Sequence, residues 1–180
     1  MGRPSCKLSF ANPLAKLAGL IACVVMLPGM QSRLGGSELR LLHAHNVERG
    51  TQDLPPLEWD KVLEANARAY AQDLARSGRF EHSPNKPGQP LEGENLWRGV
   101  AGEFAPERMV GLWIAEKKNF VPGRFPKTSS TGKIADVSHY TQIMWRRTNK
   151  VGCAIAHGEA REILVCRYSR PGNIVGQFVF

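Results

Sequence analysis

Apolar residues recur at helical spacing in three separate stretches of the chain. The first runs from Ser37, a good helix-capping residue, to Gly50, and the second runs from the capping residue Asp60 to Gly78. The third begins at Pro106, which suits the first position of a helix. Each stretch predicts an amphipathic helix. The apolar stripes are Leu39, Leu42 and Val47; Leu63, Ala67, Tyr70, Ala71 and Leu74; and Met109, Leu112 and Trp113.

The pattern changes to strands near the C-terminal end. Residues 151–158 and 161–169 predict a β-hairpin, and residues 175–180 can add a last strand. In the hairpin, positions whose numbers sum to 319 face each other, which places Cys153 opposite Cys166, within disulfide distance. Both faces of this hairpin are apolar, so both need a cover of helices. We therefore expect an α+β fold, a three-layer α-β-α sandwich around a small central antiparallel sheet.

The first 35 residues read as an export signal. Three basic residues and no acidic ones precede an almost purely apolar run from Leu17 to Met30, which is too short to span a bilayer at ~20 residues. We expect a signal peptide over about residues 1–35, cleaved between 30 and 37, and one domain over 36–180. Two alternatives stay open: a lipid anchor on Cys23, because Leu20-Ile21-Ala22-Cys23 resembles a lipoprotein box, and an uncleaved membrane anchor. The mature protein is expected to have no membrane span.

Loss of this leader changes the charge and the cysteine count. Removing the three basic groups of residues 1–32 lowers the formal net charge from +8 to +5. No Lys/Arg run or aromatic-interleaved basic patch indicates nucleic-acid binding, so we expect no nucleic-acid partner. Two of the four cysteines, Cys153 and Cys166, remain, and an even pair in an exported chain predicts one disulfide.

Residues 138–148 contain a histidine, several hydrogen-bonding side chains and a tryptophan close together. Asp136 or Ser138 can cap a short helix whose first turn carries His139. Glu116 is a carboxylate on the apolar face of the third helix, suited to a rim salt bridge or to a site. Residues 81–95 lack periodicity and predict an ordered loop or a very short strand. His157 falls opposite Glu162 near the hairpin turn, as a surface polar pair.

Residues 37–180 contain seven motifs in this order: His45-Asn46-x-x-Arg49, Pro56-Leu57-x-Trp59-Asp60, Glu81-His82-Ser83, Gly93-Glu94-Asn95-Leu96, Trp113-x-x-Glu116, His139-Tyr140-Thr141-Gln142-x-x-Trp145 and Val165-Cys166-Arg167-Tyr168-x-x-x-Gly172-Asn173. Together they resemble the CAP superfamily of cysteine-rich secretory proteins, antigen 5 and plant pathogenesis-related 1 proteins. The resemblance is greatest to the short bacterial members, which are also called SCP-domain proteins. Ser138 stands where many members have Gly, and Phe80 stands where many eukaryotic members have Cys. We expect no C-terminal cysteine-rich extension of the kind that venom relatives have.

The resemblance implies a cleft formed by His82, Glu94, Glu116 and His139. Two neutral imidazoles with waters suit a borderline divalent metal, and zinc is the first choice. We therefore expect His82 and His139 as metal ligands, with Glu94 and Glu116 in supporting positions. His45 belongs to a motif that we interpret as structural packing and hydrogen bonding.

Two classes of function follow. The first is a secreted binding module whose cleft or apolar groove takes a sterol, another lipid, an extracellular protein or a surface. The second is a metal-dependent, protease-like hydrolase with Glu94 or Glu116 as general base to a metal-bound water. The sequence has no HExxH segment and no nucleophile motif, which favours the module, and no residue is assigned as catalytic.

Overall fold

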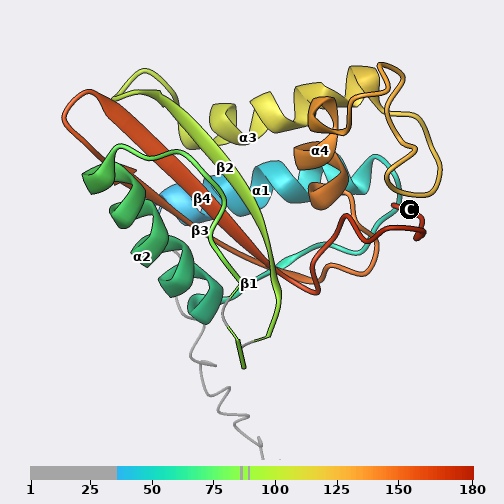
Figure 1. The fold of residues 1–180 in the computed structure, drawn as a ribbon, viewed down its shortest axis with the longest axis horizontal. Coiled ribbons are helices and arrows are strands. Elements are labelled where there is room, and N and C mark those ends of the chain that lie inside the picture. The colour runs from blue at the N-terminus through green and yellow to red at the C-terminus, as the bar shows by residue number, and fades with distance from the viewer. Residues whose placement is uncertain (1–35, 86, 89) are drawn as a thin grey trace, which may run out of the picture. The chain divides into compact units, whose positions relative to one another are not determined.

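A computed structural model describes residues 36–180, apart from 86 and 89 (Figure 1). The predicted signal peptide, its cleavage site and the Cys23 anchor lie outside the described residues. No helix in the described part of the chain is long and apolar enough to cross a membrane. The elements are α1 (Gly36–Gly50), β1 (Glu58–Trp59), α2 (Lys61–Ser77), β2 (Glu92–Val100), α3 (Pro106–Ile114), the 3-10 helices η1 (Ala115–Asn119) and η2 (Ile134–Asp136), α4 (Ser138–Ile143), β3 (Lys150–His157) and β4 (Arg161–Ser169).

The four strands form one sheet in the order β1-β3-β4-β2. The three long strands are antiparallel, and the two-residue β1 adds a short parallel pairing to β3. The predicted hairpin register is confirmed, since Cys153 lies opposite Cys166 and His157 opposite Glu162. The two cysteines form a disulfide, with their Cα atoms 4.1 Å apart.

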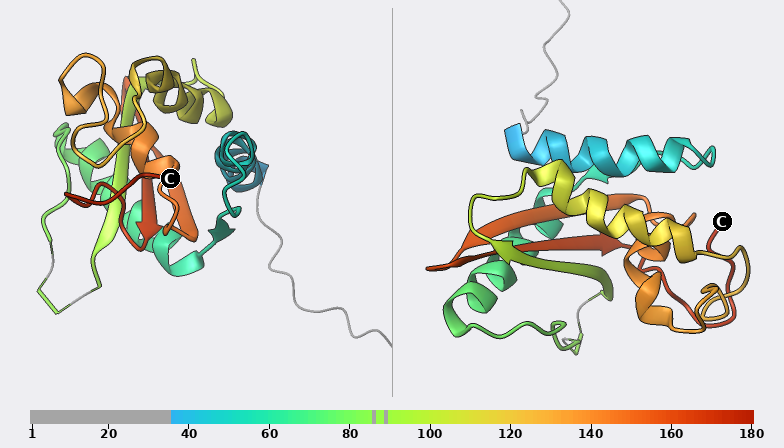
Figure 2. Two further views of the ribbon diagram at one scale, coloured as in Figure 1. Left: turned by 90° about the vertical axis from the view of Figure 1, so that its right-hand side faces the viewer. Right: turned by 90° about the horizontal axis from the view of Figure 1, so that it is seen from above.

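Helices cover both faces of the sheet, which confirms the predicted α-β-α sandwich (Figure 2). On one face Val151, Leu164 and Tyr168 share a core with side chains of α1, α3 and α4. On the other face Ala154 and Val165 belong to a second core, which they share with α2. The alternation of side chains along the hairpin therefore divides the interior into two cores.

The second helix begins and ends where the sequence predicts. Asp60 accepts hydrogen bonds from the backbone N–H groups of Val62 and Leu63, and Gly78 ends the helix at a left-handed φ of 71°. The first turn of α2 lies directly on β3. A Cβ atom at Gly152 would collide with backbone atoms of Asp60 and Glu64, so only glycine permits this approach.

The predicted apolar stripe of α1 is wrong at two of its three positions, Leu39 and Val47, whereas Leu42 is partly buried against the core. Leu39 and Val47 are 53% and 56% exposed, whereas the buried residues of this helix are Leu41, His45, Glu48 and Arg49. On α3 likewise, Met109, Val110 and Trp113 are buried, and Leu112 is exposed. The buried face of α1 is largely polar because its polar side chains find partners on distant elements.

Two further predictions about strands are corrected. Residues 92–100, whose start was expected to be a loop or a very short strand, form the nine-residue edge strand β2. Residues 175–180 form no strand, and only an isolated bridge joins Phe178 to Arg124. A turn at Gly176, with a φ of 81°, interrupts extended pairing there.

Candidate functional site

The short helix α4 is capped by a carboxylate from a distant part of the chain. Neither Asp136 nor Ser138 caps it, so that prediction is wrong. Instead Glu116, on η1, accepts hydrogen bonds through Oε2 from the backbone N–H groups of His139 (3.0 Å) and Tyr140 (3.1 Å). Glu116 therefore stabilises the free N–H groups that every helix start exposes.

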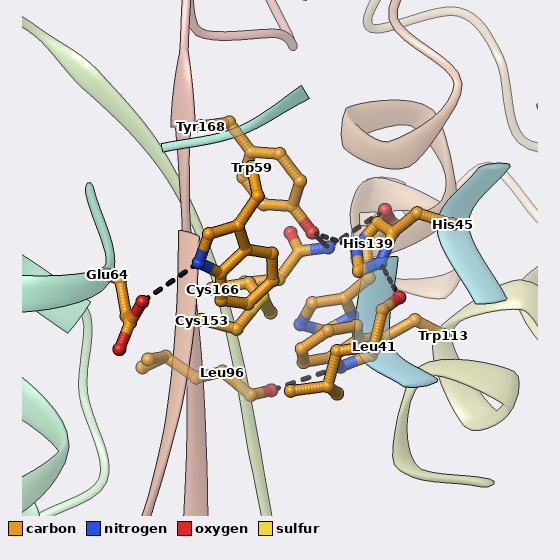
Figure 3. The surroundings of a disulfide bond; sticks show 11 residues. Leu41, His45, Trp59, Glu64, Leu96, Trp113, His139, Cys153, Cys166 and Tyr168 are labelled. Carbon is orange, nitrogen blue, oxygen red and sulfur yellow. Dashed lines mark hydrogen bonds between the residues drawn. A yellow bond between two sulfur atoms is a disulfide. The ribbon is translucent and has the colours of Figure 1, made fainter. Parts of the chain in front are cut away.

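The same carboxylate holds the His139 ring. Oε1 of Glu116 accepts a hydrogen bond from Nδ1 of His139 at 2.6 Å. The imidazole stacks on the Trp113 indole, with ring centroids 5.8 Å apart and planes at 15°. The indole N–H in turn donates to the Leu96 carbonyl, as Figure 3 shows. The His139 ring is thus fixed from its face and from its Nδ1 edge.

The second histidine is paired in the same way but stands in the open. Nδ1 of His82 donates to Oε1 of Glu94 at 2.6 Å, and the Ser83 N–H donates to the same oxygen at 3.0 Å. The His82 side chain is 64% exposed, whereas that of Glu94 is 7% exposed. The buried member of this pair is therefore the carboxylate.

Glu94 is kept ionised by its neighbours. Burial favours its neutral form, but the His82 hydrogen bond, the Arg167 charge and the Ser83 N–H outweigh burial and lower the pKa of Glu94. The Arg167 guanidinium lies 2.9 Å from Oε2 of Glu94 and over the Tyr70 ring. A charge pair inside the protein thus supports the exposed His82.

Neighbouring residues of β2 link the two histidines to the sheet. Glu94 holds His82, and the next residue, Asn95, donates from Nδ2 to the His139 carbonyl at 3.1 Å. The preceding residue, Gly93, lies so close to Gln142 of α4 that a Cβ atom would collide with its side-chain amide. The Gly-Glu-Asn sequence therefore sets the position of α4 and of both imidazoles against one strand.

A pocket of about 580 Å³ opens beside the exposed pair. His82, Glu94 and Arg167 contribute polar groups to its wall, and Tyr70 and Leu91 contribute apolar surface. Glu116 and His139 are not among the residues that line this pocket. The structure thus arranges the four predicted residues as two His–Glu pairs, and their joint action on one ligand stays a prediction.

The donor chemistry of the two pairs suits a metal with few protein ligands. Each Nδ1–H is taken by a carboxylate, and among the described residues no hydrogen bond to Nε2 of either ring is formed. An Nε2 lone pair on a ring oriented in this way is the usual metal-binding form of histidine. Within the described part of the chain, however, no three or more His, Cys, Asp or Glu side chains are grouped to hold a metal. The residues present fit an ion bound by imidazole and completed by water.

The histidine motif of α1 is structural, as we interpreted it. His45 is fully buried and bonds through its two ring nitrogens to the Leu41 carbonyl and the Tyr168 hydroxyl, both at 2.8 Å. Burial lowers the pKa of His45 to about 4, so the ring is neutral. Arg49, also buried, donates to the carbonyls of Ile143 and Trp145 and so fixes the chain that leaves α4.

Sequence reasoning missed three supporting side chains. Asn95, Trp113 and Arg167 all lie inside the quoted motifs, but their types alone do not tell which atoms they contact. The signal for Asn95 was its place beside Glu94, because adjacent strand residues point to opposite faces. Because of this alternation, Glu94 and Asn95 contact different parts of the fold.

Comparison with known proteins identifies relatives over most of the chain. The model of the cysteine-rich secretory protein family, CAP, matches residues 42–168. A pathogenesis-related protein of PR-1 type from Sambucus nigra is 35% identical over 159 residues, covering 87% of this chain and 90% of its own. Pathogenesis-related protein 1B from Nicotiana tabacum is 31% identical, covering 81% and 82% of the two chains.

Solved structures share the fold. BmVAL-1 matches with a TM-score of 0.60 and 25% identity, over 85% of each chain. A structure of NaASP2 with Zn²⁺ matches with a TM-score of 0.65 over 83% of this chain and 88% of its own, and its 21% identity supports the fold alone. The family model, the plant relatives and the shared sandwich agree that this chain belongs to the CAP family of cysteine-rich secretory proteins.

Proposed function

We propose that the protein is a secreted binding module in which His82 and His139 bind a divalent ion, with zinc as the first choice. One observation carries the proposal: β2 holds both imidazoles through Glu94 and Asn95, and a carboxylate at 2.6 Å orients each ring through Nδ1, which leaves Nε2 available. Glu94 and Glu116 would then orient the ligands rather than bind the ion. A bound ion would supply positive charge for the polar group of a ligand or partner.

The pocket beside His82 supports an amphipathic ligand. Its volume of about 580 Å³ falls within the range of small-molecule sites. Tyr70, Leu91 and Pro84 offer apolar contacts, while His82 and Arg167 offer donors at one wall. We propose a sterol or another lipid as its occupant, with an extracellular protein or surface as the alternative partner.

Hydrolysis is the less favoured alternative because both carboxylates are already engaged. Glu116 accepts three N–H groups through its two oxygens. Glu94 accepts two through Oε1 and faces Arg167 with Oε2. A general base needs an oxygen within reach of the water that it deprotonates, and these contacts would have to break first.

Secretion is part of the proposal and rests on two features. The Cys153–Cys166 disulfide is typical of an oxidising compartment. The basic-then-apolar sequence of the first 35 residues is typical of an export signal. N-terminal sequencing of the protein from its own host is expected to find a start after residue 29, whereas a lipidated Cys23 would establish the anchored form.

Calorimetric titration with zinc tests the site. His82→Ala and His139→Ala are each expected to abolish or severely weaken binding, and Glu94→Gln to weaken it roughly 10–100-fold. Because protons compete with the ion for imidazole, binding should also weaken in acid.

The chain supplies a matched control for this titration. His157 also pairs through Nδ1 with a buried carboxylate, Glu162, at 3.0 Å, but it lies at the end of β3 beside the hairpin turn. His157→Ala should leave zinc binding unchanged. If His157→Ala abolishes binding and the two cleft variants retain it, the assignment is wrong. If the wild type binds no divalent ion, the four residues form a polar network without metal.

Turnover of a peptide and ester panel separates the module from the hydrolase. The module is expected to give none with zinc present. Activity that disappears in both Glu94→Gln and Glu116→Gln would favour the hydrolase instead, because these carboxylates are its only proposed general bases.

A further inference from the structure

Charge is divided unequally along the domain. Residues 36–116 contain nine Lys and Arg against thirteen Asp and Glu, whereas residues 117–180 contain eleven against three. The first part therefore has a formal net charge of −4 and the second of +8. A division of this kind indicates an anionic partner for the basic part.

The basic residues of the second part are also less often paired. Lys117, Lys150 and Arg167 contact carboxylates. Within the described residues, Arg124, Lys127 and Arg146 are all exposed, and none of them forms an ion pair. Exposed cations of the first part that do contact carboxylates are Arg40, Lys61, Arg68, Arg76 and Arg79.

Backbone contacts bring together the segments that carry three of the unpaired cations, Arg124, Lys127 and Arg146. The N–H of Phe125 donates to the Gln177 carbonyl, so residues 121–128 lie along residues 174–179. The Arg124 guanidinium donates to the Gly176 carbonyl at 2.7 Å, and the Arg146 N–H donates to the Val179 carbonyl at 2.8 Å. Figure 1 shows these segments together at the end of the domain where α3 and α4 finish.

Apolar side chains stand among these cations. Val175 is 75% exposed, Phe178 56% and Ile174 40%. The Arg124 guanidinium lies 4.1 Å from the centre of the Phe178 ring and covers part of it. Three large apolar side chains within five residues, all open to water, mark an interaction site rather than scattered surface.

We propose that this surface, formed by Arg124, Lys127, Arg146, Ile174, Val175 and Phe178, docks the protein on an anionic lipid bilayer. The cations would contact lipid phosphates, and the apolar side chains would enter the interface between headgroups and acyl chains. A soluble polyanion would match the charges but would leave Val175 and Phe178 in water. The apolar residues therefore favour a bilayer over a polysaccharide or a nucleic acid.

Vesicle co-sedimentation tests this assignment on the mature protein. Binding is expected to vesicles of phosphatidylcholine with roughly one third phosphatidylserine, and not to phosphatidylcholine alone. The Arg124→Gln, Lys127→Gln, Arg146→Gln triple variant should lose about a hundredfold in partitioning, since each basic group near such a surface contributes roughly fivefold. Phe178→Ser should lose about fivefold or more, because its half-exposed ring could no longer be buried.

Matched controls separate docking from net charge and from the cleft. Arg76→Gln, Arg108→Gln, Arg161→Gln removes the same charge elsewhere and should change vesicle binding by no more than about threefold. His82→Ala and His139→Ala should bind vesicles like the wild type, so docking and the proposed metal site fail independently. A salt titration of the wild type needs no variant, and binding should fall between about 0.1 M and 0.5 M salt.

Three outcomes would overturn the proposal. Wild type that ignores phosphatidylserine has no anionic docking surface. A control triple variant as weak as the surface triple variant would show that total charge decides binding. Heparin binding that matches vesicle binding, with Phe178→Ser unaffected in both, would assign the surface to a soluble polyanion.

Discussion

The two His–Glu pairs share one hydrogen-bond geometry but differ in how the fold supports them. Nδ1 lies 2.6 Å from Oε1 in both. The His139 side chain is 28% exposed, stacks on Trp113 and lies in the first turn of α4, whereas the His82 side chain is 64% exposed. At His139 the site is part of the folded core, and at His82 the site is attached to the fold by one carboxylate.

A third His–Glu pair shows that this hydrogen-bond geometry alone does not identify a functional site. His157 and Glu162 are 3.0 Å apart, again with an exposed ring and a buried carboxylate, at the tip of the hairpin. A His–Glu contact in this protein is therefore no sign of a site by itself. The two cleft pairs differ from the third because adjacent residues of β2, Glu94 and Asn95, bind them to the same strand.

The largest expected effect on the free energy of unfolding comes from buried His45. It depends on pH, so the two pairs have to be compared at a pH where His45 does not titrate. Its pKa is lowered from 6.5 to about 4 by burial, so the unfolded chain binds a proton that the folded chain rejects. Stability is then fully present above pH 6.5 and falls as pH drops from 6.5 to about 4, by roughly 3 kcal/mol. Urea unfolding at several pH values measures this loss.

His45→Gln provides the control, because glutamine does not titrate. The fall between pH 6.5 and 4 should shrink by that amount in the variant. A fall that persists unchanged would assign it to another group. Glu94 acts lower on the pH scale: its pKa is lowered from 4.5, so its contribution to stability is present above pH 4.5 and is lost as pH falls through the folded pKa.

The next effect should come from Glu116→Ala, measured at neutral pH. The variant leaves the N–H groups of His139 and Tyr140 without their acceptor, and the His139 ring without its partner. We expect the free energy of unfolding to fall by about 2–3 kcal/mol. Glu116→Gln, which keeps one acceptor oxygen, should restore part of it. Equal losses in both variants would mean that the charge, rather than the cap, is the stabilising element.

The sequence predicted the sheet far better than the surroundings of the site. Residues 151–169 are apolar on both faces and contain two cysteines, so one register satisfied both the apolar faces and the disulfide. The strand β2 was not foreseen because Gly93 lies against Gln142 and because Glu94 and Asn95 bind other elements, so these positions do not show the pattern of a strand. A strand can be recognised from its sequence pattern only where its side chains pack into the core.

Partners far apart in sequence explain the other misses. The sequence indicated a cap of α4 at Asp136 or Ser138, next to the helix, but the cap is Glu116, 23 residues before His139. The sequence indicated a buried face of leucine and valine on α1, but that face holds His45 and Arg49. Their hydrogen-bond partners lie about a hundred residues away in the sequence. A polar residue predicts burial only when its distant partner is known.

His139→Ala is expected to have a smaller effect on stability than loss of its carboxylate. The variant removes a ring stacked on Trp113 and leaves Oε1 of Glu116 without a donor, while Oε2 still caps α4. A loss of about 1–2 kcal/mol in the free energy of unfolding follows. Denaturant unfolding of His139→Ala beside His139→Gln checks it. If His139→Ala costs as much as Glu116→Ala, ring and cap are one unit.

The smallest effect is expected for His82→Ala, and it is the sharpest test of the comparison. The ring is mostly in water, and Glu94 keeps the Ser83 N–H and the Arg167 charge when the ring is removed. The free energy of unfolding should change by less than about 0.5 kcal/mol, as for other exposed side chains. Zinc titration of the same preparation should nevertheless show severe loss of binding. Loss of binding without loss of stability would identify His82 as a residue kept for a ligand, whereas a stability loss equal to that of His139→Ala would show that both histidines are structural.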